Sequence, residues 1–260
     1  MTTEPLEPPP APTASGHRGH PGLFVSFEGG DGVGKSTQLE LLAGWLRASG
    51  HEVVTTREPG GTPLGRQLRE AVLHGDHMGA RAEALLYAAD RAHHVDTVVR
   101  PALERGAVVL TDRYLDSSVA YQGDGRLLGA REVEQLSLWA TEGLLPDLTV
   151  LLDLDPAVGL ARLTGTPDRL ERAGAEFHER TRRAFLARAT TPRWLVVDAA
   201  HGIEAVQQQV RARTAALLPM GASTEGVVAH PATGDRVARP PAGDGAARPA
   251  AHDGAGGALA

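Results

Sequence analysis

Short apolar runs alternate along the chain with longer stretches in which apolar residues recur every three to four positions. The apolar runs have the length and composition of buried strands, and they cover residues 23–27, 51–56, 107–111, 148–153 and 194–198. Helical spacing predicts helices over residues 36–48, 64–73, 79–100, 131–142, 156–163, 174–189 and 202–217. Strands of this kind, separated by helices, indicate an α/β fold with a parallel sheet covered on both faces.

The two ends of the chain differ in composition from the part between them. Residues 1–21 are rich in proline, and they lack the charged start and apolar run of a signal peptide. Residues 219–260 are rich in Ala, Gly and Pro, with too few large apolar side chains to offset the entropy of ordering. We therefore expect one folded domain, residues 22–218, between a disordered N-terminal arm and a disordered tail.

Charge and cysteine content narrow the class of protein. The chain of 260 residues has a net charge of −6, which argues against a broad nucleic-acid-binding surface. It has no cysteine, which excludes disulfides and thiolate metal sites, and no apolar stretch as long as a membrane span. We expect a cytoplasmic protein that acts on small molecules, without a nucleic-acid or membrane partner.

The only lysine of the chain, Lys35, lies in a glycine-rich run between the first predicted strand and the first predicted helix. The run is Gly29-Gly30-Asp31-Gly32-Val33-Gly34-Lys35-Ser36, and it fits the phosphate-binding pattern Gly-x-x-x-x-Gly-Lys-Ser, the P-loop. In such a loop, backbone N–H groups surround a polyphosphate, and the lysine adds a compact charge that the planar fork of arginine does not reproduce. The helix that follows points its free N–H groups at the phosphates. The sequence therefore predicts a nucleotide-binding protein.

Polar residues follow the second, third and fourth predicted strands. Ligands of parallel α/β sheets bind at the carboxyl ends of the strands, where this chain has residues 58–62, 112–114 and 153–155. Asp112 suits the carboxylate near the magnesium ion of a nucleotide site. Arg113 beside it can bind a phosphate through two parallel hydrogen bonds. The alternative for this pair is an ion pair at the end of the strand.

One predicted helix, residues 79–100, carries a candidate base-binding group. Tyr87, Asp90 and Arg91 share one face of it. The ring can stack on a base, and an arginine held by a nearby carboxylate can donate to a base carbonyl. The alternative is a solvent-exposed Asp–Arg pair. For His93 and His94 we expect a pair on the surface.

A second candidate group follows Arg113. Tyr114, Ser118 and Tyr121 share one face if their segment is helical. Hydroxyl groups and rings beside a phosphate-binding arginine suit a nucleoside, and ordinary packing is the alternative.

Three arginines surround a short break between two predicted helices: Arg162, Arg169 and Arg172. Phosphoryl transfer is accelerated chiefly by positioning and by positive charge on the transferring group, and an arginine contributes about 10³–10⁵ in rate. A mobile segment that carries arginines can close over two phosphates and exclude water. We call residues 162–173 the flap. The alternative is a charged, exposed helix–loop–helix.

Together these motifs resemble the thymidylate kinase family over residues 22–217. The matching runs are Phe27-Glu28-Gly29-Gly30-Asp31-Gly32-Val33-Gly34-Lys35-Ser36-Thr37-Gln38, Arg57-Glu58-Pro59-Gly60-Gly61-Thr62, Leu85-Leu86-Tyr87-Ala88-Ala89-Asp90-Arg91, Asp112-Arg113-Tyr114-Leu115-Asp116-Ser117-Ser118-Val119-Ala120-Tyr121-Gln122-Gly123 and Asp168-Arg169-Leu170-Glu171-Arg172. The resemblance implies a three-layer P-loop nucleoside-monophosphate-kinase fold with a five-stranded parallel sheet, ATP-dependent phosphorylation of dTMP to dTDP, magnesium and a homodimer. Gly32 takes a position where one branch of the family has an arginine, which implies the bacterial branch with its catalytic arginines in the flap.

The same resemblance implies roles for individual residues, motif by motif. It implies ATP binding by Gly29, Gly30, Asp31, Gly32, Val33, Gly34, Lys35, Ser36 and Thr37, and metal binding by Ser36, Asp31 and Asp112. It implies dTMP binding by Glu58, Pro59, Tyr87, Asp90, Arg91, Arg113, Ser118, Tyr121 and Gln122. In this set Tyr87 stacks on thymine, Arg91 contacts its carbonyl and Arg113 holds the phosphate. The implied catalytic residues are Lys35, Asp31, Arg113, Arg162, Arg169 and Arg172, and which flap arginine reaches the transferring phosphoryl group stays open.

The sequence bears on three alternative functions. A P-loop GTPase needs Asn-Lys-x-Asp for guanine, and this chain has no asparagine and no second lysine. Another nucleoside-monophosphate or deoxynucleoside kinase differs only in the acceptor pocket. A non-catalytic nucleotide-binding module is disfavoured by the Asp112–Arg113 pair and the flap arginines.

We expect removal of residues 221–260 to leave the kinetic constants unchanged, because the composition of this tail predicts disorder. Steady-state kinetics and size-exclusion chromatography of the full and the shortened chain check this. A large loss of activity or of dimerisation would show that the tail has a structural role.

Overall fold

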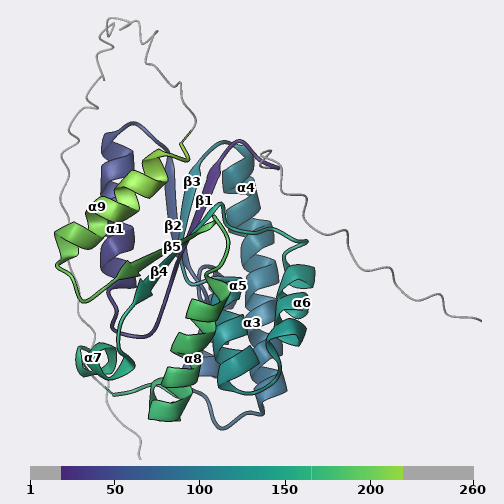
Figure 1. Cartoon of the computed structure of the whole chain (residues 1–260). Helices are drawn as coiled ribbons and strands as arrows, with labels where there is room; N and C mark the ends of the chain where they lie inside the picture. Colours follow the sequence, from purple (N-terminus) through teal and green to yellow (C-terminus); the bar gives the residue numbers. More distant parts are fainter. Residues whose placement is uncertain (1–18, 165, 219–260) are drawn as a thin grey trace, which may run out of the picture. The chain divides into compact units, whose positions relative to one another are not determined.

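A five-stranded parallel sheet forms the centre of the computed structural model, which describes residues 19–164 and 166–218. The strands are β1 (Leu23–Glu28), β2 (Val53–Arg57), β3 (Val108–Asp112), β4 (Leu148–Asp153) and β5 (Trp194–Asp198). Their order across the sheet is β2-β3-β1-β4-β5, and every neighbouring pair is parallel. The α/β fold and all five predicted strands are confirmed (Figure 1).

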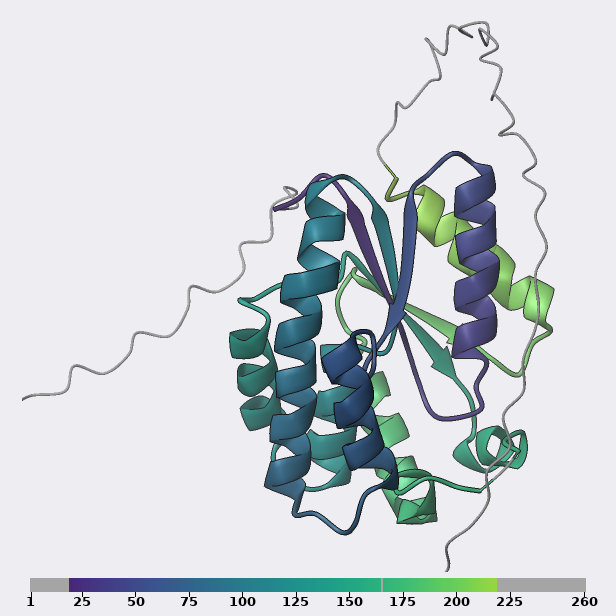
Figure 2. The ribbon, with the colours of Figure 1, turned by 180° about the vertical axis from the view of Figure 1, so that it is seen from behind.

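Helices cover both faces of the sheet, as Figures 1 and 2 show from opposite sides. On one face, α1 (Lys35–Ala48) and α9 (Ile203–Ala215) pack against the side chains of Leu23, Val25 and Phe27. On the other face, Phe24 and Val109 pack against apolar residues of η1 (Val95–Val99), α4 (Arg100–Glu104) and α6 (Ala130–Ala140). Successive strand residues point to opposite faces, and every residue of β1 is buried, so the sheet requires a helical layer on each side of β1.

The remaining helices are α2 (Pro63–His74), α3 (Ala80–His94), η1 (Val95–Val99), α4 (Arg100–Glu104), α5 (Leu115–Ser118), η2 (Val119–Gly125), α6 (Ala130–Ala140), α7 (Pro156–Ala161), η3 (Glu171–Ala173) and α8 (Ala175–Arg188). Each predicted helix is found, with bounds that differ by a few residues. The predicted helix 79–100 continues as η1 and α4 to Glu104, with a π-helical turn over η1. The segment after Tyr114 is helical, which the sequence left conditional.

Two helix starts near the site have clear local causes. Thr62 Oγ1 accepts a hydrogen bond from Gly65 N at 2.8 Å, and Pro63 occupies the first position of α2. Asp155 caps α7 in the same way through Ala157 N at 2.8 Å, again with proline at the first helical position. A side-chain acceptor followed by proline is a strong signal for a helix start. Both helices therefore begin where the chain leaves the carboxyl end of a strand.

The predicted arm and tail fall almost wholly on residues outside the described ranges, so these domain boundaries stay a prediction. Among the described helices, none combines the length and the apolarity that a membrane crossing requires.

Candidate active site

The glycine-rich loop joins β1 to α1 at the carboxyl edge of the sheet. Gly32 has a φ of +72°, and a Cβ there would lie 2.0 Å from the carbonyl oxygen of Gly159 in α7. Gly29 has a φ of +129°, and its Cβ would lie 2.4 Å from Leu152 O. Glycine is the residue that adopts such φ values without strain. The loop therefore has no room for any side chain at position 32, and an arginine would not fit there.

Lys35 begins α1 and is buried beneath the loop. Its Nζ donates to Gly30 O at 2.6 Å and to Gly29 O at 3.3 Å. Burial and the neighbouring guanidinium of Arg113 lower the pKa of Lys35. The ammonium group thus lies among backbone groups of the loop, where a bound polyphosphate would meet the N-terminus of α1.

Ser36 and Asp112 bring two hard oxygen ligands together beside Lys35. Ser36 Oγ donates to Asp112 Oδ2 at 2.8 Å, and Asp112 ends β3. Within residues 19–164 and 166–218, no three His, Asp or Glu side chains gather as a metal site. Magnesium needs no such group, because it is commonly held by one or two carboxylates together with substrate phosphates and water. The donor set of Ser36 and Asp112 therefore fits magnesium.

Arg113 has a left-handed backbone, with a φ of 72°, which is uncommon for a residue other than glycine. Its guanidinium donates to Asp31 Oδ1, to Gly29 O at 2.9 Å and to Tyr121 Oη at 3.2 Å. Tyr121 Oη in turn donates to Asp31 Oδ2 at 3.3 Å. Burial raises the pKa of Asp31, but Arg113 and Lys35 outweigh it and hold this pKa below its usual value.

Asp31 therefore lies on the Arg113 side of the site. Both of its carboxylate oxygens bond to Arg113 or Tyr121, whereas the oxygens of Ser36 and Asp112 bond to each other. Metal binding by Asp31 stays a prediction.

A cavity of about 410 Å³ runs from the glycine-rich loop to the helices on the second face of the sheet. Of the predicted site residues, it is lined by Asp31, Gly32, Gly34, Lys35, Ser36, Thr37, Glu58, Pro59, Tyr87, Arg91, Asp112, Arg113, Ser118, Tyr121, Gln122 and Arg162. Its lining does not include Gly29, Gly30, Val33, Asp90, Arg169 or Arg172. Residues from both sequence motif groups, the loop and the helix 79–100, thus meet at one cavity.

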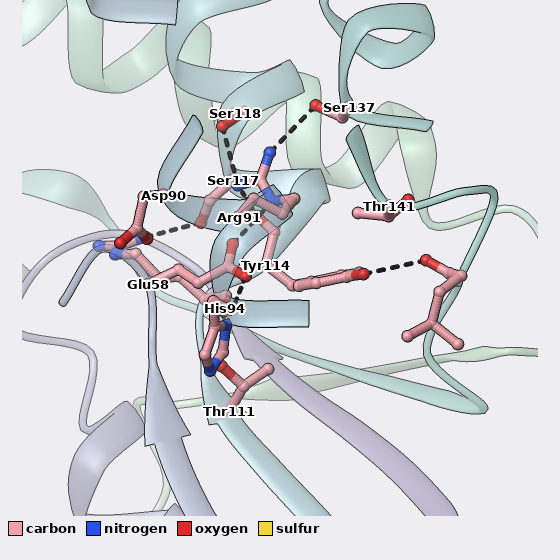
Figure 3. Close-up of polar contacts among 12 residues, drawn as sticks. Glu58, Asp90, Arg91, His94, Thr111, Tyr114, Ser117, Ser118, Ser137 and Thr141 are labelled. Carbon is pink, nitrogen blue, oxygen red and sulfur yellow. Dashed lines mark hydrogen bonds and ion pairs between the residues drawn. The ribbon is translucent and has the colours of Figure 1, made fainter. Parts of the chain in front are cut away.

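Arg91 lies at the end of this cavity in a buried hydrogen-bond network (Figure 3). Its Nε donates to Glu58 Oε2 at 2.7 Å, and its Nη1 donates to Ser137 Oγ at 3.0 Å. Its Nη2 donates to Tyr114 O at 3.2 Å and to Ser118 Oγ at 3.0 Å. These bonds use four of the five N–H donors of a guanidinium. Among the described residues, nothing accepts from the second N–H of Nη1, which can therefore donate to a ligand.

Two expectations about this helix are corrected. The carboxylate that holds Arg91 is Glu58, at 2.7 Å, and not Asp90. His94 is fully buried rather than on the surface, with Nδ1 2.8 Å from Glu58 Oε1 and Nε2 2.7 Å from Thr56 Oγ1. Asp90 lies behind the cavity wall, where it accepts from Gly60 N at 3.4 Å. Burial and the carboxylate of Glu58 raise the pKa of Asp90 to about 6.

The three flap arginines have different surroundings. Arg162 is exposed and lines the cavity. Arg169 binds the carboxylate of Glu83 on α3 and donates from Nε to Val72 O at 2.8 Å. Arg172 donates to Pro167 O within the flap. Arg162 is therefore the one of these three side chains that faces the cavity.

Sequence reasoning missed several residues of the site. Arg57, Arg69 and Ser117 also line the cavity, and Glu28 and Glu83 lie directly behind it. Tyr114, a member of the second candidate group, lines the cavity as well. A signal existed for Glu28, which is a charged residue at the end of a mostly apolar strand. Glu28 Oε1 accepts from Tyr114 N at 2.8 Å, and Oε2 lies 2.5 Å from Ser117 Oγ. Burial and the carboxylate of Asp116 raise the pKa of Glu28 to about 8.

We expect Glu28→Gln to stabilise the protein in alkaline solution. A carboxyl whose pKa is higher in the folded state favours folding below pH 4.5, its ordinary value, and loses this contribution as pH rises through about 8. Glutamine mimics the protonated form, so the difference in unfolding free energy between variant and wild type should grow by more than about 1.4 kcal/mol between pH 4.5 and 9. Urea denaturation across this range measures it. The exposed Glu40→Gln is the control, and parallel pH curves for wild type and Glu28→Gln would contradict the prediction.

Comparison with known proteins gives consistent matches over this domain. A family model described as Thymidylate kinase matches residues 27–210. A protein named Thymidylate kinase from Clavibacter michiganensis subsp. michiganensis is 64% identical over 208 residues, which are 78% of this chain and 99% of the relative. Proteins of the same name from Leifsonia xyli subsp. xyli and Bifidobacterium longum are 64% and 59% identical, over 74% and 71% of this chain and 94% and 93% of their own lengths.

Proposed function

The chain belongs to the thymidylate kinase family, and from this membership we propose its reaction, the roles of its residues and its assembly. It is a phosphotransferase that uses ATP to phosphorylate dTMP to dTDP. The observation that carries this proposal is the single cavity that joins Lys35, Arg113 and Arg91. A nucleoside triphosphate and a nucleoside monophosphate can meet there with their phosphates between Lys35 and Arg113.

We assign the loop of residues 29–37 to the phosphates of ATP. Lys35 and the N–H groups at the start of α1 then meet the β- and γ-phosphates. Arg162, which lines the cavity from the flap, is the first candidate for the arginine that contacts the transferring group. Arg169 and Arg172 are supported more weakly, because they bond to Glu83 and to Pro167 O.

We assign the other end of the cavity to dTMP. Arg113 holds its phosphate, while Asp31 and Tyr121 both accept hydrogen bonds from its Nη2 and orient the guanidinium. Tyr87 stacks on the thymine ring, and the free N–H of Arg91 donates to a thymine carbonyl. The other acceptor-side residues are Glu58, Pro59, Asp90, Ser118 and Gln122. Transfer then proceeds in line between the two phosphates, with catalysis by position and positive charge.

Magnesium is the proposed cofactor, held by Ser36 and Asp112. When bound with ATP, the ion supplies charge neutralisation on the phosphate oxygens. The proposal is supported by the 2.8 Å contact between these two oxygen ligands at the end of β3.

A homodimer in the cytoplasm is also proposed from the family resemblance. The dimer is supported by large apolar side chains that are exposed on α3, on α6 and on the turn between η2 and α6: Leu85, Trp139 and Leu127. An exposed apolar surface of this kind is typical of a protein–protein contact.

An acceptor panel tests the proposed reaction. ADP release from ATP and magnesium is measured with dTMP, dUMP, dCMP, dGMP and AMP in turn. Turnover should be strongest with dTMP, weaker with dUMP and negligible with the others. A preference for another acceptor nucleotide would support the kinase activity but refute the thymine pocket. Turnover with none of the five would indicate a nucleotide-binding module.

A further inference from the structure

Glu83 is a fully buried carboxylate on α3, one layer behind the acceptor end of the cavity. It does not line the cavity, but its neighbour Gln122 does. Glu83 Oε1 accepts from Gln122 Nε2 at 2.8 Å. Glu83 Oε2 accepts from Arg169 Nη1 and, at 3.3 Å, from Arg126 Nη2. The carboxylate thus connects the nucleoside pocket to the base of the flap.

The charge of Glu83 fixes which end of the Gln122 amide points toward it. An ionised carboxylate only accepts hydrogen bonds, and two guanidinium groups balance its charge. Gln122 must therefore turn its NH₂ group toward Glu83 and its carbonyl oxygen away. Gln122 is itself 1% exposed, so its amide has little freedom to turn over. Among the described residues, no donor bonds to Gln122 Oε1.

We propose that Glu83 is a specificity-determining residue that acts through Gln122. By holding the NH₂ group, Glu83 presents the amide oxygen of Gln122 to the cavity as a hydrogen-bond acceptor. This acceptor matches a pyrimidine whose N3 carries a hydrogen, as in thymine and uracil. It disfavours cytosine, because N3 of cytosine is also an acceptor and the two acceptors cannot form a hydrogen bond. The inference rests on the proposed function and adds to it the residue that sets the preference for N3–H bases.

A purely structural role for Glu83 predicts a different result. If Glu83 served only to anchor Arg169 and Arg126, its loss would lower kcat/KM for all acceptor nucleotides by the same factor. If Glu83 orients Gln122, its loss changes the ratio of kcat/KM between acceptor nucleotides. A neutral amide at position 83 can also donate a hydrogen bond, so the Gln122 amide can rotate by 180°. The ratio of kcat/KM for dTMP to that for dCMP therefore separates the two roles.

The experiment compares wild type, Glu83→Gln and Arg126→Gln with dTMP, dUMP and dCMP. We expect Glu83→Gln to lower the dTMP/dCMP ratio about tenfold or more, the equivalent of one misoriented hydrogen bond. The loss for dTMP should lie in KM rather than in kcat, and dUMP should follow dTMP. Arg126→Gln removes one ion pair from Glu83 without changing its acceptor character, so it should leave the ratio unchanged. An unchanged ratio in Glu83→Gln would overturn the proposal.

A swapped pair guards against a variant that fails to fold. In Glu83→Gln/Gln122→Glu the amide at position 83 donates to the carboxylate at position 122, whose second oxygen again faces the cavity. The dTMP/dCMP ratio should return toward the wild-type value, and failure to return in a folded protein would overturn the proposal. Wild type itself offers a measurement without any variant, because 3-methyl-dTMP lacks the N3–H, and full turnover of it would also overturn the proposal. If wild type does not phosphorylate dTMP, the proposed function fails instead.

Discussion

Replacement of Lys35 by alanine is expected to lower kcat by on the order of 10³ or more while leaving the fold intact. Nζ of Lys35 bonds only to the carbonyl groups of Gly29 and Gly30 among the described residues, so no core packing depends on it. A positive charge in a buried site interacts more strongly with phosphate than it would in water. Steady-state kinetics measure kcat, thermal denaturation measures the stability of the fold, and calorimetric titration measures the affinity for dTMP. Binding of dTMP should be unchanged, because Arg113 holds its phosphate.

Two control variants isolate the cause. Lys35→Arg keeps the positive charge but should also lose most activity, because the guanidinium is larger and its planar fork does not fit the loop. Arg47→Ala removes a positive charge from the exposed C-terminal end of the same helix and should leave kcat unchanged. A Lys35→Ala variant with wild-type rates would refute the phosphate-binding role of the loop.

Much of the site could be predicted because its residues directly follow strands. A parallel sheet brings the carboxyl ends of β1, β2 and β3 to one edge, so the glycine-rich loop, Glu58 and Asp112 had to lie near one another. Local spacing also placed Tyr87 and Arg91 on one face of α3. These inferences needed only periodicity and the rule for parallel sheets.

The network behind the cavity could not be predicted in the same way. Glu58 and Arg91 are 33 residues apart in the chain, and Glu83 and Arg169 are 86 apart. A charged residue in a helical pattern is predicted to be solvent-exposed unless the partner that balances its charge is known. The expectation for His94 was wrong for this reason, because its partner Thr56 lies in β2 and its partner Glu58 lies in the loop after β2.

The helix that carries Tyr87 and Arg91 illustrates a second limit. Pro101 has no backbone N–H, so a helix is expected to end before it. The chain instead continues through the π-helical turn η1 into α4, where Pro101 takes one of the first two positions. Whether a helix ends or changes its hydrogen-bond pattern is decided by packing, and here Val95, Val99 and Leu103 all pack into one core beside Phe24.

Replacement of Arg91 by methionine is expected to lower the free energy of unfolding by about 3–5 kcal/mol. Arg91 and Glu58 form an ion pair in which both side chains are 2% exposed. Removal of the guanidinium leaves the carboxylate of Glu58 buried, with His94 as its remaining side-chain partner. It also leaves the hydroxyl groups of Ser118 and Ser137 without this donor. Urea denaturation measures the loss, and KM for dTMP should rise in parallel.

A surface pair with nearly the same geometry provides the matched control. Arg105 Nε lies 2.8 Å from Glu52 Oε1, but these side chains are 49% and 56% exposed, so Arg105→Met should cost no more than about 1 kcal/mol. The double variant Arg91→Met/Glu58→Gln removes the unbalanced charge and should recover part of the stability lost in Arg91→Met. Equal losses for Arg91→Met and Arg105→Met would contradict this account. The loss in unfolding free energy would then come from lost contacts alone. In that case the buried charge of Glu58 would not explain why the acceptor end of the site needs all of its hydrogen-bond partners.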